Sequence, residues 1–256
     1  MGSLEYSPTT GVVVTGGGSG IGRACCMALA EAGRPVAAWD LNAAGAKETA
    51  ELICDRYGVP AVALEVDVRD ASSFPEAVAS SKGSLGSVGG LVHAAGVAGP
   101  MPVDWIDEET WDAVLDVNLR AQVMLVRALI DELRAAKPGS AIVGISSVEG
   151  LTGNAMLPAY CSSKAGLLGL TRSLAHRLAG EQIRVNAVCP GAVDTPMLAP
   201  ALANEGMVEM IVGSVPWGRV ADPSEIARVV RFLLSDDASY VTGEHIVVDG
   251  GMTSTT

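Results

Sequence analysis

The chain has 256 residues, of which 49% are hydrophobic and 18% charged, and its net charge is −12 at pH 7. This length and hydrophobicity favour one large folded domain and exclude a wholly disordered chain. The sequence contains no basic stripe, so nucleic-acid binding is disfavoured, and the acidic balance disfavours contact with anionic membranes.

Residues 1–10 are predicted to form a flexible polar tail, without the apolar stretch of a signal peptide. No apolar run approaches the length of a membrane span. The five cysteines are an odd number without a C-x-x-C pair, so neither a disulfide framework nor a metal site is indicated. Reduced thiols indicate a cytoplasmic protein.

From residue 11 onward, short apolar runs alternate with helical patterns. The predicted strands are Gly11–Thr15, Pro35–Trp39, Ala61–Val66, Gly90–Ala94, Ala141–Ser146, Arg184–Val188 and Glu244–Val248. The predicted helices are Ile21–Ala32, Ala43–Tyr57, Glu108–Ala136, Pro158–Ala179 and Ser224–Leu234. Short continuous strands separated by helices predict a parallel sheet covered on both faces. We therefore expect a single-domain, doubly wound α/β fold of Rossmann type, with about seven strands, over residues 11–256.

The stretch from Thr195 to Trp217 departs from this alternation. It is rich in Met, Pro, Ala and Gly and lies late in the chain. We expect an insertion with short helices that acts as a lid over the substrate.

A glycine-rich octet, from Thr15 to Gly22, lies between the first strand and the first helix. The free N–H groups of a helix N-terminus suit a pyrophosphate, and glycines let the backbone approach the phosphates. The alternative is a turn that binds nothing, but the strand–turn–helix context favours a dinucleotide site. The predicted contacts are Gly16, Gly18, Ser19, Gly20, Ile21 and Gly22.

Asp40 ends the second strand, where an acid can accept hydrogen bonds from the adenosine ribose. It would also repel the 2′-phosphate of NADP, and no Arg or Lys occurs at positions 16–20 or 40–43 to attract that phosphate. NAD is therefore predicted over NADP. A helix N-cap or turn role is the alternative for Asp40. After the third strand, Asp67 and Val68 could hold the adenine, although Asp also caps helices.

Tyr160 and Lys164 begin a predicted helix with a spacing that places both on one face. The Lys164 ammonium is expected to lower the pKa of the Tyr160 hydroxyl, since one charge at ~4 Å contributes about 4 kcal/mol at an effective dielectric of ~20. Tyr160 could then exchange a proton with an alcohol oxygen. Ser147, after the fifth strand, could hold that oxygen by a hydrogen bond. Taken alone, Ser147 is better explained as a turn hydroxyl, and the Tyr-x-x-x-Lys spacing is also common in exposed helix pairs.

Taken in this order, the octet, the acid after the second strand, the serine and the Tyr-x-x-x-Lys motif resemble the short-chain dehydrogenase/reductase family over about residues 11–251. The resemblance implies that Asn118, Ser147, Tyr160 and Lys164 are catalytic, with Asn118 kinking its helix and holding a relay water. It implies that Lys164 also binds the nicotinamide ribose. The further cofactor contacts implied by the resemblance or by strand-end position are Leu41, Ala94, Ala95, Gly96, Pro190, Gly191, Val193 and Thr195.

This chain departs from the family at His93-Ala94-Ala95-Gly96, where the family often has Asn-Asn-Ala-Gly. A bracing side-chain hydrogen bond from the second Asn should be missing at Ala94, whereas cofactor binding through the backbone should survive. We expect His93 to be structural. The resemblance also implies a homotetramer or dimer built on the two longest helices.

Three functions compete. The first is an NAD(H)-dependent oxidoreductase acting on a secondary alcohol or ketone, with Ser147, Glu149, Asn154, Tyr160 and Met197 contacting the substrate. The second is a 3-oxoacyl-thioester (acyl-carrier-protein) reductase, which needs a basic entrance for the phosphopantetheine. The third is a non-catalytic NAD-binding regulator, which should lack the Tyr or the Lys; both are present here.

Overall fold

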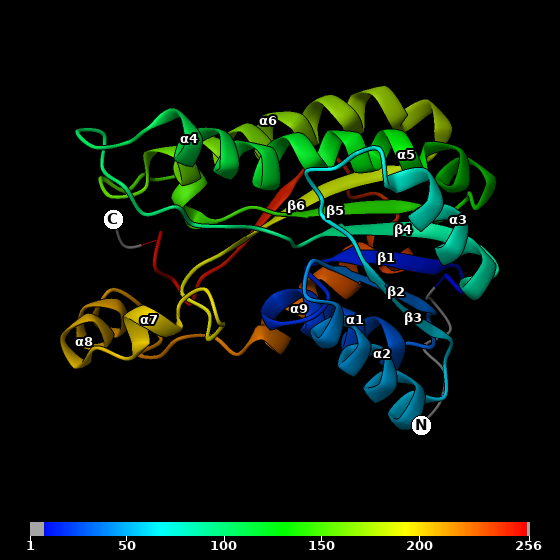
Figure 1. Cartoon of the computed structure of the whole chain (residues 1–256), viewed down its shortest axis with the longest axis horizontal. Helices are drawn as coiled ribbons and strands as arrows, with labels where there is room; N and C mark the ends of the chain where they lie inside the picture. Colours follow the sequence, from blue (N-terminus) through cyan, green and yellow to red (C-terminus); the bar gives the residue numbers. More distant parts are fainter. Residues whose placement is uncertain (1–7, 255–256) are drawn as a thin grey trace.

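The computed structural model describes residues 8–254 and has one seven-stranded parallel sheet in the order β3-β2-β1-β4-β5-β6-β7 (Figure 1). The strands are β1 (Gly11–Thr15), β2 (Val36–Asp40), β3 (Ala61–Glu65), β4 (Val88–His93), β5 (Ala141–Ile145), β6 (Arg184–Pro190) and β7 (His245–Val248). The α-helices are α1 (Gly20–Glu31), α2 (Ala43–Tyr57), α3 (Phe74–Leu85), α4 (Glu108–Leu115), α5 (Ala121–Ala135), α6 (Pro158–Leu178), α7 (Ala199–Leu202), α8 (Glu205–Gly213) and α9 (Pro223–Leu233). The predicted doubly wound fold is confirmed.

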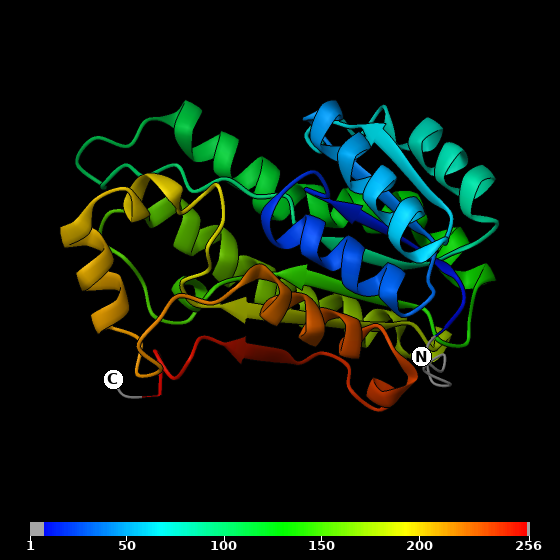
Figure 2. The same cartoon turned by 90° about the horizontal axis from the view of Figure 1, so that it is seen from below.

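Helices cover both faces of the sheet, with α1, α2 and α9 on one side and α3 to α6 on the other (Figures 1 and 2). Strand order reverses between β1 and β4, since β2 and β3 lie on one side of β1 and β5 to β7 lie beyond β4. Ligands bind doubly wound sheets beyond the carboxyl ends of the strands at this point. Both the octet after β1 and Ala94 after β4 therefore lie at the expected binding position.

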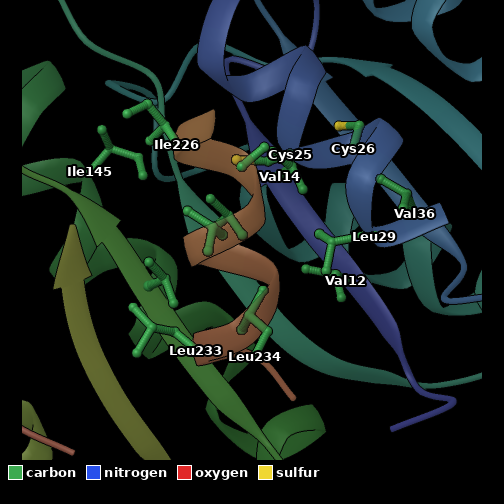
Figure 3. Close-up of a cluster of buried hydrophobic side chains, with 14 of the residues drawn as sticks. Val12, Val14, Cys25, Cys26, Leu29, Val36, Ile145, Ile226, Leu233 and Leu234 are labelled. Carbon is green, nitrogen blue, oxygen red and sulfur yellow. The ribbon is translucent and has the colours of Figure 1, made fainter. Parts of the chain in front are cut away.

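The core on the α1 side is built from side chains that are remote in sequence. Val12 and Val14 of β1 pack with Leu29 of α1 and with Ile226 and Leu233 of α9 (Figure 3). The thiols of Cys25 and Cys26 are buried in the same cluster. Because α1 and α9 both pack against β1, the start of α1 is held beside the end of β1.

Two elements differ from the sequence prediction. Helix α3 is missing from the predicted list because Ser80, Ser81, Gly83 and Ser84 interrupt its helical pattern, yet Phe74 and Leu85 at its ends are buried. The predicted helix Glu108–Ala136 is real but is divided by a π-helical turn at Asp116–Arg120, between α4 and α5. Asn118 lies inside this turn.

The last residue before β1 is hydrogen-bonded to the rest of the domain. Thr10, assigned to the flexible tail, accepts hydrogen bonds from Arg34 at its carbonyl (2.9 Å) and its hydroxyl (3.1 Å). Thr10 is therefore hydrogen-bonded to the folded domain, whereas residues 1–7 of the predicted tail lie outside the described residues. Within residues 8–254, no helix combines the length and the hydropathy needed to cross a membrane.

Two buried arginines hold the end of α9. Arg34 donates to the carbonyl of Leu234 (3.0 Å), and Arg184 donates to the carbonyls of Leu233 (2.6 Å) and Ser235 (2.9 Å). Cations stabilise a helix C-terminus, and these carbonyls have no partner further along the helix. Burial lowers the pKa of Arg34 to about 10, so the guanidinium stays charged at neutral pH.

We expect the substitution Arg34→Met to lower the free energy of unfolding by about 2–4 kcal/mol, because it leaves buried carbonyls without donors. Urea unfolding followed by circular dichroism measures this. Arg228→Met, at an exposed position of α9, is the control and should change stability by about 0.5 kcal/mol or less. Equal effects of the two substitutions would contradict the assignment.

Candidate active site

The glycine-rich loop after β1 is packed so closely that side chains cannot replace two of its glycines. Gly16 has φ +67°, and a Cβ there would lie 2.9 Å from the Ala95 nitrogen. A Cβ at Gly22 would lie 2.0 Å from the Gly16 carbonyl oxygen. The loop is therefore a backbone-only surface pressed against Ala94 and Ala95, which sequence reasoning placed at the same site.

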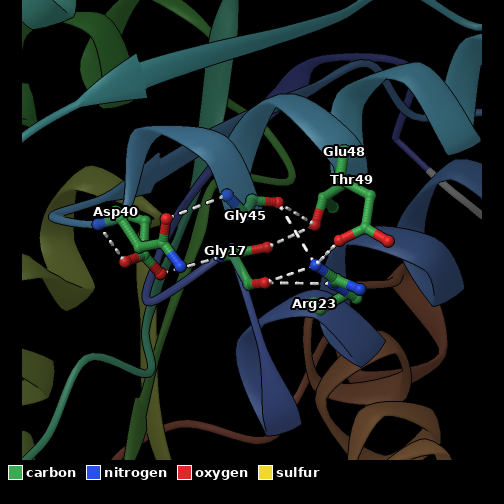
Figure 4. Close-up of polar contacts among 8 residues, drawn as sticks. Gly17, Arg23, Asp40, Gly45, Glu48 and Thr49 are labelled. Carbon is green, nitrogen blue, oxygen red and sulfur yellow. Dashed lines mark hydrogen bonds and ion pairs between the residues drawn. The ribbon is translucent and has the colours of Figure 1, made fainter.

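Asp40 and Arg23 hold this loop from two sides (Figure 4). The Asp40 carboxylate accepts the Gly18 and Asn42 N–H groups, both at 2.8 Å. Arg23 donates to the Gly18 carbonyl (2.7 Å) and pairs with Glu48. Asn42, not Asp40, caps α2, so the N-cap alternative for Asp40 is wrong, while its turn role is real. The sequence analysis missed Arg23, although it directly follows Gly22.

The start of α1 carries free donors. Its N-cap Ser19 makes no side-chain capping bond, and its first turn contains no acid. The first N–H groups of a helix have no partner within the helix, and they attract anions. A cradle of glycines, a helix N-terminus and a carboxylate at the end of β2 fit the pyrophosphate and ribose of a pyridine dinucleotide. Gly16 to Gly22 and Asp40 would hold it.

Other predicted cofactor residues lie along the same edge. Thr195 lies against Gly20, since a Cβ at Gly20 would be 3.3 Å from its methyl group. A larger residue does not fit at Gly191, because a Cβ atom there would lie 2.9 Å from Asp249. Val193 is buried and bridges to Ala221. Pro190 ends β6, Leu41 is exposed next to Asp40, and Ile21 is half-buried in α1.

The carboxylate of Asp67 is paired with the neighbouring Arg69. The carboxylate accepts from Arg69 Nη2 at 2.6 Å and from the Arg69 N–H at 2.9 Å, and these bonds lower the pKa of Asp67. It caps no helix. Val68 is buried behind it. Their contact with adenine stays a prediction.

Tyr160, Ser147 and Lys164 come together beyond the end of β5. The Ser147 hydroxyl lies near the Tyr160 side chain and acts to lower the pKa of Tyr160. Lys164 Nζ lies 5.4 Å from the centroid of the Tyr160 ring. Ser147 is nearly buried, and its oxygen also accepts the Glu149 N–H at 3.1 Å. The three predicted side chains therefore converge.

The electrostatics differ from the expectation. Burial is the largest influence and raises the pKa of Tyr160 above its ordinary value. Lys164 Nζ donates to the Ile145 carbonyl at 2.8 Å, and burial lowers the pKa of Lys164 to about 8. The predicted lowering of the Tyr160 pKa by Lys164 is therefore not met. In this state the phenol is protonated at neutral pH and suited to donate a proton.

Asn118 ties the loop after β4 to α6. Its side chain accepts from the Val97 N–H (2.9 Å) and donates to the Val97 carbonyl and to Ser163 Oγ, both at 3.0 Å. Both amide N–H groups and one lone pair of the amide oxygen are therefore bonded to protein groups, and the side chain is fully buried. The implied kink is present as the π-helical turn, while the relay water stays a prediction. Ser163 was missed because only the fold brings it to Asn118.

His93 links the glycine-rich loop to the π-helical turn. Its Nε2 lies 3.0 Å from the Val117 carbonyl, so Nε2 carries the proton, and Nδ1 accepts from Thr15 Oγ1 at 2.9 Å. Thr15 in turn accepts the Ala95 N–H at 3.2 Å. Burial lowers the pKa of His93 to about 3, so the ring is neutral. This bracing fits the expected structural role.

The other predicted substrate residues, Glu149, Asn154 and Met197, lie in the segments that follow β5 and β6. Glu149 accepts a hydrogen bond from Asn154 at 3.0 Å, so the two are linked to each other. The Met197 side chain is half-exposed. Its Cε atom and Lys164 Nζ both lie close to Gly96, because a Cβ atom added at Gly96 would be 3.9 Å from Met197 Cε and 3.6 Å from Lys164 Nζ. Met197 therefore reaches towards Lys164. The insertion contains the short helices α7 and α8, as expected, whereas its lid motion stays a prediction.

Comparisons with known proteins agree with this arrangement. A family model described as enoyl-(acyl carrier protein) reductase matches residues 16–253. The chain is 37% identical to the 3-oxoacyl-[acyl-carrier-protein] reductase FabG of Thermotoga maritima over 243 residues, covering 94% of this chain and 96% of the relative. It is 37% identical to 2-(S)-hydroxypropyl-CoM dehydrogenase 3 of Xanthobacter autotrophicus over 247 residues, covering 95% and 96%.

A solved structure is similar over nearly the whole chain. A protein of Sinorhizobium meliloti 1021 described as a putative short-chain alcohol dehydrogenase superposes with a TM-score of 0.91 and is 36% identical. The match covers 96% of this chain and 97% of that protein.

Proposed function

The chain belongs to the short-chain dehydrogenase/reductase family, and from this premise we propose that it is an NAD(H)-dependent oxidoreductase acting on a secondary alcohol or ketone. Family membership makes it an oxidoreductase acting on CH–OH groups. The observation that carries the finer proposal is the convergence of Ser147, Tyr160 and Lys164 beside the glycine-rich loop.

The proposed chemistry assigns each side chain a task. The bound nicotinamide supplies or accepts the hydride. Tyr160 Oη donates its proton to the carbonyl oxygen in reduction and takes it back in oxidation. Ser147 Oγ holds the same oxygen by a hydrogen bond. Lys164, positively charged below about pH 8, favours negative charge on Tyr160 Oη after the proton has left.

NAD is the proposed cofactor because Asp40 places a carboxylate at the end of β2, held by Gly18 and Asn42. We expect Asp40→Ser to raise the ratio of kcat/KM with NADPH to that with NADH by about 10–100-fold, because the ribose loses a charged acceptor and the 2′-phosphate loses a repulsive one. Steady-state kinetics with both cofactors measure the ratio. Glu51→Ser on α2 is the control. A wild-type preference for NADPH would refute the assignment.

A carrier-protein thioester reductase is the second candidate, favoured by the name of the Thermotoga relative. A regulator that binds NAD without turnover is the third. A panel of secondary alcohols, diols, steroids and acyl thioesters, read by nicotinamide absorbance with both cofactors, separates them. Turnover of thioesters alone would favour the second candidate, and cofactor binding without any turnover would favour the third.

A homotetramer is proposed on the outer faces of α5 and α6. A groove of about 270 Å³ lies there. It is lined by Val123, Val126, Ile130, Leu174 and Leu178 and by Arg127, Arg134 and Arg177. Exposed apolar groups of this kind suit packing against another subunit. Gel filtration showing a stable monomer would count against this. A cytoplasmic location is proposed on the free thiols of all five cysteines.

A further inference from the structure

Three segments surround the catalytic residues. Residues 96–109 follow β4, residues 147–157 follow β5, and residues 194–218 follow β6. These strands are parallel neighbours, so their carboxyl ends and the segments after them meet at one edge of the sheet. Figures 1 and 2 both place α4, α7 and α8 at this end. We call the three segments the site rim.

The site rim exposes large apolar side chains from every segment. Six of them are between 47% and 76% exposed, namely Val103, Trp105, Met156, Met197, Met210 and Trp217. Monomeric proteins rarely expose apolar groups in such concentration unless they bind something there. Met197, which reaches towards Lys164, joins this apolar surface to the catalytic residues.

The site rim also has charge of one sign. Its three segments contain no Lys, Arg or His, whereas each contains a carboxylate, such as Asp104, Glu149 and Glu209. The next cation along the chain, Arg219, lies over the ring of Trp217 at the edge of the site rim, 5.9 Å from its centroid. Its charge is paired with both carboxylate oxygens of Glu225 at 2.7 and 2.8 Å. Lys164 is buried and bonded to a backbone carbonyl. An approaching substrate therefore meets apolar and negative groups.

On the basis of the proposed function, we propose that the substrate is a bulky apolar ketone or secondary alcohol that carries no negative charge. Burial against the apolar rim favours size, and the carboxylates repel anions through the local potential. Phosphopantetheine thioesters and sulfonates are anionic and are disfavoured. In this respect the chain differs from what the names of its acyl-carrier-protein and coenzyme M relatives indicate for those proteins.

The first test compares matched substrates with the wild-type protein. A methyl ketone ending in a carboxylate is compared with its methyl ester, in low salt, and unsubstituted methyl ketones of increasing length are compared with one another. We expect kcat/KM to favour the ester at least fivefold, and to rise by up to about fourfold per added methylene until the rim is filled. A smaller preference, a preference for the acid, or indifference to length would overturn the inference.

The second test reverses charge at the site rim. In Asp104→Lys/Glu209→Lys the preference for the ester should fall by at least threefold at low salt, and this change should disappear in high salt, where exposed charges are screened. Asp55→Lys/Glu76→Lys is the control, since both acids are exposed on α2 and α3. Both pairs change the net charge from −12 to −8. Equal effects of the two pairs would overturn the inference.

The outcomes also separate this inference from the proposed function. If none of the ketones, alcohols or thioesters is turned over with either cofactor, the proposed function is wrong and the inference fails with it. If the only substrates turned over are ketones or alcohols that carry a carboxylate, the proposed function stands and the inference alone is wrong. If only thioesters are turned over, the second candidate function is favoured and the inference is wrong as well.

Discussion

Replacing Tyr160 with Phe is expected to lower kcat by about a thousandfold, the scale of positioned general acid–base catalysis. The substitution removes only the hydroxyl group, which lies near Ser147. Since burial raises the pKa of Tyr160, the wild-type phenol is protonated at neutral pH. Ketone reduction should therefore proceed at pH 7, whereas alcohol oxidation, which needs the phenolate, should accelerate as the pH rises.

The readouts for Tyr160→Phe are kcat, the affinity for NADH from its fluorescence, and the midpoint of thermal unfolding. Only kcat should change strongly, because the ring still fills its place and the glycine-rich loop is untouched. Tyr240→Phe, at a fully exposed position, is the control and should leave all three unchanged. Full activity of the Tyr160 variant with every accepted substrate would show that another group transfers the proton.

The sheet was predictable because its strands are short runs of apolar, mostly β-branched residues, such as Val12 to Val14, which have few alternatives to burial. Helix α3 was not, because it has only a narrow buried face, at Phe74, Ala77, Val78, Ser81 and Leu85, in a segment rich in Ser and Gly. The π-helical turn at Asp116–Arg120 was not visible in the helical pattern either. One extra residue per turn hardly disturbs the apolar rhythm of a long helix.

Some features of the candidate site could likewise be predicted from the sequence, and others could not. Tyr160 and Lys164 could be paired from their spacing, since residues four apart share a helix face. Their electrostatics could not be predicted, because the Ile145 carbonyl that receives Lys164 Nζ comes from another element, the strand β5. The contact of Arg23 with Gly18 spans a turn, and that of Ser163 with Asn118 spans 45 residues. Contacts that only the fold creates leave no periodic signal in the sequence.

Replacing Lys164 with Met is expected to lower kcat/KM by about 100-fold or more while making the folded protein more stable at pH 7. The activity falls because a positive charge beside Tyr160 is lost. The stability rises because burial disfavours the charged lysine, whose pKa is about 8 in the folded protein against an ordinary value of 10.5. The gain should be about 1–3 kcal/mol, after allowing for the lost bond to the Ile145 carbonyl.

The sign of the pH dependence is a further check on Lys164. Between about pH 8 and pH 10.5 the unfolded chain holds this proton while the folded protein has released it, so wild-type stability gains from a rise in pH in that window. The advantage of the Met variant in urea unfolding should therefore be greatest below pH 8 and shrink towards pH 10. Lys47→Met, at an exposed position of α2, should show no such trend. A Met variant that is less stable than the wild type at pH 7 would contradict this account, because it would mean that the folded protein stabilises the charge of Lys164.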